Sequence, residues 1–88
     1  MEPNISLSTS STKQPKNLIG PAIRRIRLAQ RTPITQQDLS ARLATRGVTL
    51  DQSAIARIEC GERGVSDIEA VAIAKALRVP IEKLFTNK

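Results

Sequence analysis

The segment LDQSAIARIECGER, from Leu50 to Arg63, combines small and polar side chains that would let a ligand lie close against it. On a helical wheel with about 100° per residue, its side chains separate into two faces. One face is apolar and carries Ile55 and Ile58. The opposite face carries an amide, a hydroxyl, a methyl group and a guanidinium, which belong to Gln52, Ser53, Ala56 and Arg57.

These four side chains match the chemistry of base edges in duplex DNA. A glutamine amide can donate to and accept from adenine, an arginine guanidinium can donate to guanine or to a phosphate, and a serine hydroxyl can do either. Alanine is small enough to let a helix enter a major groove about 12 Å wide, and its methyl group can contact thymine. The pattern therefore predicts a helix face that contacts the bases of DNA. For this segment taken alone, the alternative is an ordinary solvent-exposed polar face.

The charge of the whole chain favours an anionic partner. Its 88 residues include 14 Lys and Arg and 8 Asp and Glu, which gives a formal net charge of +6. Nucleic acid, an acidic membrane surface and an acidic protein all fit such an excess. Solubility alone is the competing explanation of a basic composition.

The scarcity of reactive side chains argues against catalysis. The chain has no histidine and a single cysteine, Cys60. Nucleophile pairs that need histidine, an intrachain disulfide and a zinc site built from thiolates are therefore excluded. We expect no enzyme activity, no metal site and no cofactor, and no small-molecule ligand is indicated.

The N-terminal stretch differs in composition from the rest. Residues 1–17 are rich in Ser, Thr, Pro and Asn, so we expect a flexible, disordered tail before a domain at 18–88. Lys13 and Lys16 could contact phosphates, although tails of this kind more often have no specific role. The stretch lacks the apolar region of a signal peptide, and no run approaches the roughly 18 apolar residues of a membrane span. We expect a cytoplasmic protein without membrane contact.

From Leu18 onward, apolar spacing and capping residues predict helices. Three segments share an apolar residue, a capping residue and a second apolar residue four positions after the cap; the caps are Thr35, Asp51 and Ser66. This is the pattern of an N-cap with a hydrophobic staple. Asn17 could cap a first helix, which tolerates Pro21 in its first turn. The predicted helices are 18–31, 35–46, 51–60, 66–77 and 80–86.

No segment shows the alternation of a strand, so five short helices predict a compact all-α domain. Its core would be aliphatic, because Phe85 is the one aromatic residue of the chain. The predicted core residues are Ile19, Ile23, Ile26, Leu39, Leu43, Leu50, Ile55, Ile58, Ile68, Val71, Ala72, Leu77, Ile81, Leu84 and Phe85.

The pieces IGPAIRRIR, ITQQDLSARL, DQSAIARIECGER and SDIEAVAIAKALRVPIEKLF follow one another in the order of a known family. Together they resemble the helix-turn-helix regulators that include phage repressors and Cro proteins, the Xre family, over Leu18 to Phe85. The resemblance implies a five-helix, lambda-repressor-like domain in which the helix at 51–60 enters the major groove. Two departures stand out: the connector between Leu43 and Ile55 is longer than the usual tight turn by about five residues, and Cys60 stands where the family commonly has Asn.

The resemblance also implies roles for single residues. Base reading falls to Gln52, Ser53, Ala56 and Arg57. Phosphate contact is implied for Gln36, which also braces Gln52, and for Gly61, Arg63 and Ser66 in the loop and helix start that follow. Arg42 and Arg46 lie one turn apart and could flank the phosphate backbone. Arg27 and Glu59 match a partly buried ion pair, and a redox role for Cys60 stays open.

We therefore predict a protein that binds double-stranded DNA sequence-specifically, as a repressor-like transcriptional regulator associated with the nucleoid of a prokaryote or encoded by a phage. One such unit reads only a few base pairs, so we expect a homodimer through the last helix, around Val79 to Phe85. A protein-interaction module of the same fold is one alternative. Another is the antitoxin of a toxin–antitoxin pair, which would hold its toxin through the tail.

Overall fold

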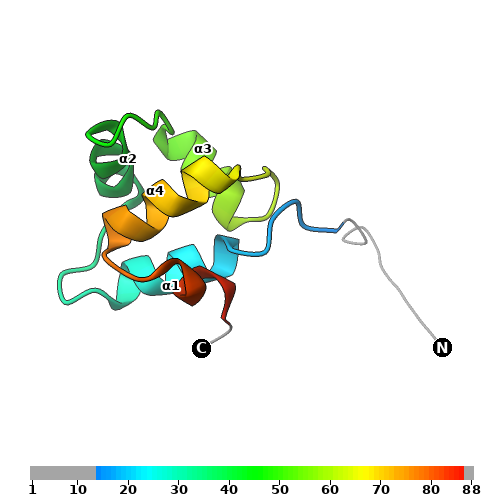
Figure 1. The fold of residues 1–88 in the computed structure, drawn as a ribbon, viewed down its shortest axis with the longest axis horizontal. Coiled ribbons are helices and arrows are strands. Elements are labelled where there is room, and N and C mark those ends of the chain that lie inside the picture. The colour runs from blue at the N-terminus through cyan, green and yellow to red at the C-terminus, as the bar shows by residue number, and fades with distance from the viewer. Residues whose placement is uncertain (1–13, 87–88) are drawn as a thin grey trace.

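The computed structural model describes residues 14–86, which form four α-helices and one 3₁₀ helix with no strand among them (Figure 1). The elements are α1 (Gly20–Ala29), α2 (Gln36–Ala44), α3 (Gln52–Glu59), α4 (Asp67–Leu77) and the 3₁₀ helix η3 (Ile81–Phe85). The all-α prediction is confirmed, and each element lies inside its predicted range. None of these helices has the length and apolar character that crossing a membrane requires.

The starts of α2, α3 and α4 follow the predicted capping pattern. The hydroxyl of Thr35 accepts from the amide of Asp38, and the carboxylate of Asp38 accepts in return from the amide of Thr35. Ser66 and Glu69 form the same reciprocal capping box. At the start of α3, the Asp51 carboxylate accepts from an amide of the first turn at 2.8 Å. Each cap satisfies amides that the first helical turn leaves without a partner.

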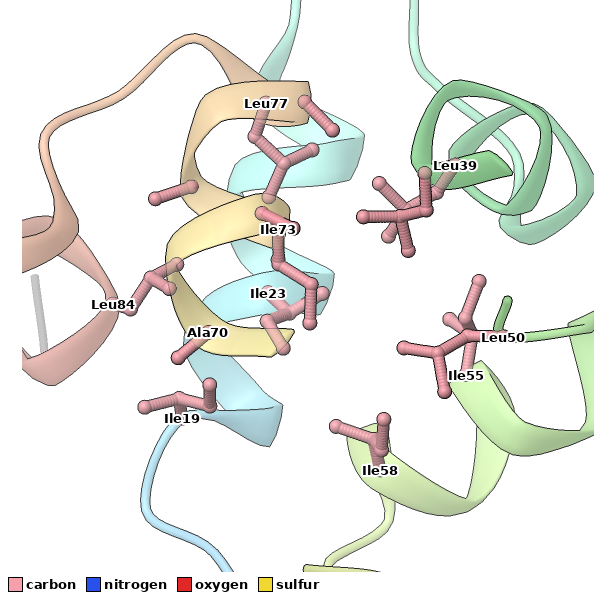
Figure 2. Close-up of a cluster of buried hydrophobic side chains, with 14 of the residues drawn as sticks. Ile19, Ile23, Leu39, Leu50, Ile55, Ile58, Ala70, Ile73, Leu77 and Leu84 are labelled. Carbon is pink, nitrogen blue, oxygen red and sulfur yellow. The ribbon is translucent and has the colours of Figure 1, made fainter. Parts of the chain in front are cut away.

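Helix α4 runs through the middle of the domain and contacts α1, α2 and η3 (Figure 1). Figure 2 shows the aliphatic cluster around it, in which Ile55 and Ile58 of α3 point toward Ile23 of α1 and Ile73 of α4. All four side chains are almost fully buried. Because the isoleucines anchor α3 from one side only, its other side is left at the surface.

Most of the predicted core residues are buried. Ile26 is half-buried and packs against the core cluster, and the sequence analysis missed Ile34, which is buried. The core predictions that the structure confirms are Ile19, Ile23, Leu39, Leu43, Leu50, Ile55, Ile58, Ala72, Leu77 and Leu84.

The core prediction was wrong for one face of α4. Ile68 and Val71 are 72% and 40% exposed, whereas Ala70, Ile73 and Ala74 are buried. The apolar residues of α4 lie on several sides of the helix, so their spacing alone does not show which side faces the core. The buried stripe contains the alanines, whose small side chains let α4 lie close to its neighbours. The bulkier outer residues stay in contact with solvent.

The last element also differs from its prediction. Residues Ile81–Phe85 form a 3₁₀ helix in which Leu84 alone is buried, and Pro80 precedes it as the N-cap residue. Phe85 is 58% exposed and Ile81 is 36% exposed, so the prediction that they lie in the core was wrong. A 3₁₀ helix has three residues per turn, so a run this short directs few side chains toward one side. Through Leu84, η3 closes the core beside α1 and α4.

The described end of the predicted tail is bound to the domain. The side-chain oxygen of Asn17 accepts from the amides of Ile19 and Gly20 at the start of α1. The N-cap residue of α1 is Ile19, not the predicted Asn17, and its side chain makes no capping bond. The side-chain nitrogen of Asn17 donates to the carbonyls of Ile58 and Arg63, at 2.9 and 2.8 Å. Asn17 therefore joins the start of α1 to the loop after α3. Residues 1–13 of the predicted tail lie outside the described residues.

Candidate nucleic-acid interface

The outer face of α3 carries the predicted base-reading residues. Gln52, Ser53 and Arg57 are exposed and Ala56 is half-buried, on the side of the helix opposite the buried Ile55. The face therefore consists of three polar side chains around one methyl group. Its polar groups can donate and accept hydrogen bonds, and it has no bulky apolar side chain that would hold a ligand away.

Gln36, the first residue of α2, meets α3 at two places. Its side-chain nitrogen donates to Glu59 Oε1 at 3.1 Å, and its oxygen faces Gln52 Nε2 at 3.5 Å. The second distance is long for a hydrogen bond. Because Glu59 fixes which way the Gln36 amide points, the oxygen of that amide is the group presented to Gln52.

The ion pair that the resemblance implies lies behind Gln36. Arg27 Nε donates to Glu59 Oε2 at 2.8 Å, and Arg27 Nη2 donates to Glu59 Oε1 at 2.9 Å. The two side chains are 7% and 4% exposed. Arg27 Nη1 also donates to the carbonyl oxygen of Ile34 at 2.8 Å. This bidentate geometry, with its additional hydrogen bond, compensates the removal of two charges from water and fixes α1 against α3.

Sequence reasoning missed a close backbone contact at Gly20. A Cβ atom at this position would overlap the carbonyl oxygen of Ile58 and lie 3.0 Å from that of Glu59. The first turn of α1 therefore touches the backbone of the last turn of α3, and only glycine fits. A glycine inside a predicted helix, where it is intrinsically unfavourable, was the available signal.

The loop between α3 and α4 has fewer free amides than the resemblance implies. The amide of Gly61 donates to the carbonyl of Ile58, and its own carbonyl accepts from the amide of Lys16 at 2.8 Å. Gly61 has a φ of 80°, a conformation that favours glycine. The amide of Ser66 donates to Glu69 in the capping box. The amides of Gly61 and Ser66, two of the residues for which the resemblance implies phosphate contact, therefore have partners within the protein.

Arg63 is the cation of this loop. Its Nη1 atom donates to the carbonyl of Gly64 at 2.8 Å and to Glu69 Oε1 at 3.1 Å. The Arg63 guanidinium holds the pKa of the Glu69 carboxyl below its ordinary value, and Glu69 in turn raises the pKa of Arg63. The Arg63 side chain remains 32% exposed, so part of its guanidinium faces solvent at the end of α3.

Arg42 and Arg46 lie apart from the Gln36 contact. Arg42 is about 240° around α2 from Gln36 at 100° per residue, and its Nη1 donates to the carbonyl of Ala76 at the end of α4 at 3.1 Å. Arg46 follows α2 and lines the surface between α2 and α4. The structure therefore brings the two arginines to α4, and it does not bring them together with Gln36 and Gln52.

The long connector between α2 and α3 is an ordered turn. Helix α2 ends at Ala44, two residues short of the predicted end at Arg46. The amide of Val48 returns to the carbonyl of Leu43 at 3.0 Å, and Gly47 turns the chain with a φ of 79°. Val48 packs against the core cluster, so the additional residues are held to the domain before α3 begins.

Two further expectations concern Cys60 and metal ions. Cys60 is exposed just after α3. Reactive thiols need exposure together with a cationic or hydrogen-bonding environment that favours the thiolate, and Cys60 meets the first requirement. Within residues 14–86, no three His, Cys, Asp or Glu side chains are grouped so that they could hold a metal ion.

Comparison with known proteins points in the same direction as this geometry. A family model described as helix-turn-helix matches residues 23–84, which is more than half of the chain. The matched range begins inside α1, includes all of α2, the connector, α3 and α4, and ends in η3. Neither the curated proteins nor the solved structures gave a match.

Proposed function

The chain belongs to the Xre/Cro-like helix-turn-helix family, a DNA-binding family, and from that premise we propose that it regulates transcription by binding double-stranded DNA sequence-specifically. In this proposal α3 enters the major groove and α2 crosses the adjacent phosphate backbone. In this proposal the chain acts as a repressor when it is bound at a promoter. The observation that carries the proposal is the burial pattern of α3, with Ile55 and Ile58 in the core and the polar face exposed.

Base reading is assigned to four residues of α3. Gln52 and Ser53 stand in its first turn, the part of a recognition helix that meets base edges. Arg57 follows one turn later, where its guanidinium reaches a guanine or a phosphate. Ala56 lies between them and permits close approach, with its methyl group available to a thymine methyl.

Gln36 is proposed as both a phosphate contact and a brace for Gln52. Its amide is held by Glu59, and Glu59 is itself held by the buried Arg27. The neighbour of Gln52 is therefore already ordered before DNA arrives, which reduces the side-chain entropy lost on binding. The exposed part of Arg63 supplies a second phosphate contact at the other end of α3.

We infer that the protein binds as a homodimer through η3. The exposed side chains of Ile81 and Phe85 give η3 an apolar surface that a second copy would cover. Two copies would place two α3 helices on half-sites about 34 Å apart on one face of the duplex. Equilibrium sedimentation with and without DNA tests this, because a monomer under both conditions at micromolar concentration would contradict it.

Selection of bound duplexes from a random pool tests the DNA proposal most directly. We expect the selected sequences to share a roughly palindromic motif. On a selected site, Gln52→Ala or Arg57→Ala should cost about 1–3 kcal/mol and relax the base preference at one position. Gln36→Ala should weaken binding more evenly across sequences, since phosphates carry no sequence information.

The chain offers a matched control for Gln36. Gln37 is its exposed neighbour on α2, so Gln37→Ala removes the same chemical group without the contacts to Glu59 and Gln52. It should leave affinity and base preference unchanged. If Gln52→Ala, Arg57→Ala and Gln36→Ala lower affinity equally on selected and random duplexes, the assigned roles are wrong.

A second candidate function, a protein-interaction module, is favoured by one observation. The exposed Ile68 and Val71 line a hollow of about 400 Å³ with Val48, between the cations of Arg46 and Lys75. An apolar patch with a basic rim fits an acidic partner surface. Binding of random duplex at low salt separates the two functions, because a module dedicated to a protein partner should show little DNA affinity there.

A further inference from the structure

The ends of α2 and α4 line an open surface pocket that the proposed DNA-binding face does not use. Its volume is about 240 Å³, and three of its five lining residues are arginines: Arg42, Thr45, Arg46, Ala76 and Arg78. No acidic side chain belongs to this lining. In Figure 1 the C-terminal end of α4, in orange, lies beside α2, in dark green.

The positive charge of the pocket is not neutralised by ion pairs. Among residues 14–86, no carboxylate lies within salt-bridge distance of its three guanidiniums. Asp38, one turn before Arg42, accepts a hydrogen bond from the amide of Thr35 and attracts Arg42 only at longer range. The pocket therefore gathers three cations without an acidic partner in contact.

The C-terminal end of α4 holds one of these cations, Arg42, in place. Arg42 donates to the carbonyl of Ala76 at 3.1 Å, and the negative end of a helix dipole favours guanidinium groups near it. One nitrogen of Arg42 is committed to this carbonyl. Because a guanidinium has five N–H groups in a fixed plane, the others remain available to an oxyanion.

The backbone at Arg78 supports a function for its side chain. Arg78 ends α4 with a φ of 61° and is the single non-glycine residue with a positive φ among the described residues. Glycine is the usual residue at this position of a helix end. Strained residues concentrate at functional sites, and here the strained residue is one of the five that line the pocket.

We propose that this pocket binds a phosphate-type oxyanion, either free phosphate or the phosphate group of a small metabolite. Its volume lies below the roughly 300–1,000 Å³ of sites that enclose a whole drug-sized ligand, so it fits a single anionic group. A DNA phosphate has the same chemistry. The position of Arg42, turned from Gln36 toward α4, favours the free anion. This site is independent of the proposed DNA binding.

The first test is a titration of the full chain with inorganic phosphate, at constant ionic strength, followed by amide NMR shifts. We expect saturable shifts confined to the amides around Arg42, Arg46 and Arg78. The double variant Arg46→Ala/Arg78→Gly should weaken phosphate binding roughly tenfold or more, since it removes two charged donors. The variant should remain folded, because glycine relieves the backbone strain at the end of α4.

The matched control is Arg24→Ala/Arg31→Ala, which removes the same net charge from exposed positions outside the pocket. It should leave the phosphate affinity unchanged. Shifts that do not saturate, that spread over all basic residues, or that weaken equally in both double variants would overturn the proposal.

A second arm separates the free anion from DNA. The slope of log affinity for duplex DNA against log salt should be the same for the two double variants. A slope shallower in Arg46→Ala/Arg78→Gly than in the control, by about 0.9 for each arginine, would assign the pocket to the DNA backbone and overturn the proposal. Saturable phosphate binding in a chain without DNA affinity would support the pocket and contradict the proposed function alone.

Discussion

Among residues 14–86, two arginine–glutamate pairs contribute to the structure in different ways. Arg27 and Glu59 lie 32 residues apart in the sequence, join α1 to α3 and are almost completely buried. Arg63 and Glu69 lie 6 residues apart, join a loop to the helix that follows it, and keep 32% and 21% of their side chains exposed. The same chemistry therefore fixes two helices in one place and orders a loop in the other.

The difference follows from what remains when one partner is lost. Without Arg27, the Glu59 carboxylate would be a buried charge with only the Gln36 amide as a donor. Without Arg63, the Glu69 carboxylate would still accept from Ser66 and would be solvated. Distance along the chain and burial, more than the number of hydrogen bonds, set the contribution of each pair to stability.

The largest expected effect belongs to the buried pair. Arg27→Ala should lower the free energy of unfolding by about 3–5 kcal/mol, because it leaves Glu59 buried and unpaired. Urea unfolding followed by circular dichroism measures this loss. Arg24→Ala removes an exposed arginine from the same helix and should stay within about 0.5 kcal/mol of the parent chain. If Arg27→Ala lowered stability as little as the loss of an exposed pair does, burial would not explain the difference between the two pairs.

Gly20→Ala tests the backbone contact beside the buried pair. The added methyl group overlaps the carbonyl of Ile58, which cannot move like a flexible side chain. We expect a loss of about 1–3 kcal/mol from overpacking, although alanine is otherwise the better helix former. Gly64→Ala is the control, since its added Cβ would lie 3.6 Å from the carbonyl oxygen of Lys16, an ordinary contact. Equal stability of the two variants would mean that α1 can shift away from α3 at little cost.

Ser66→Ala should cost about 1 kcal/mol, the usual contribution of a helix N-cap. The hydroxyl of Ser66 accepts from the amide of Glu69, and water replaces it only in part. Ser53→Ala removes an exposed hydroxyl from α3 and should leave the unfolding midpoint unchanged. If Ser66→Ala lowered stability as much as Arg27→Ala, the start of α4 would contribute as much to stability as the buried Arg27–Glu59 pair.

The smallest effect concerns pH at the exposed pair. Arg63, together with the capping amide of Ser66, keeps the pKa of Glu69 lowered in the folded state. Its contribution to stability is therefore complete above the unfolded pKa of about 4.3 and is lost as the pH falls through the lower folded value. Glu69→Gln should make the fall in stability between about pH 5 and pH 3 shallower, by less than about 1 kcal/mol. The pKa of Asp38 is also lowered, mainly by its hydrogen bond from the backbone amide of Thr35. Asp38 therefore adds the same loss of stability at low pH to the parent chain and to Glu69→Gln.

Urea midpoints at several pH values would measure this dependence. Parallel curves for the parent chain and Glu69→Gln would mean that the Arg63–Glu69 pair makes no difference to folding. Because the chain has no histidine, the comparison is free of a side chain with an ordinary pKa between 5 and 8.

The features that could be predicted from the sequence are those formed by residues close together in the chain. The caps at Thr35, Asp51 and Ser66 were predicted correctly because each helix start bonds to residues at most three positions away. The exposed face of α3 was also accessible to sequence reasoning, since Ile55 and Ile58 share one stripe. These features depend on local spacing, which a sequence displays directly.

The remaining features depend on contacts between distant segments. The Gly20 contact and the bridge made by Asn17 require α1 to be packed on α3, and no local pattern reveals that distance. The inner face of α4 was predicted wrongly because Ile68 and Val71 are as apolar as the residues that are buried. The sequence did not show on which side of α2 the Arg42 side chain lies. In the structure it lies toward α4, where it donates to the carbonyl of Ala76.

The contact between the first helix and the last element has a consequence for synthesis on the ribosome. Helix α1 is made first, but the part of its apolar side that faces η3 is covered only when Leu84 packs beside it. A chain still missing that leucine has an incomplete core, so most of the stability should appear only after nearly the whole domain has left the exit tunnel. The domain should therefore become stable only once Leu84 has left the tunnel.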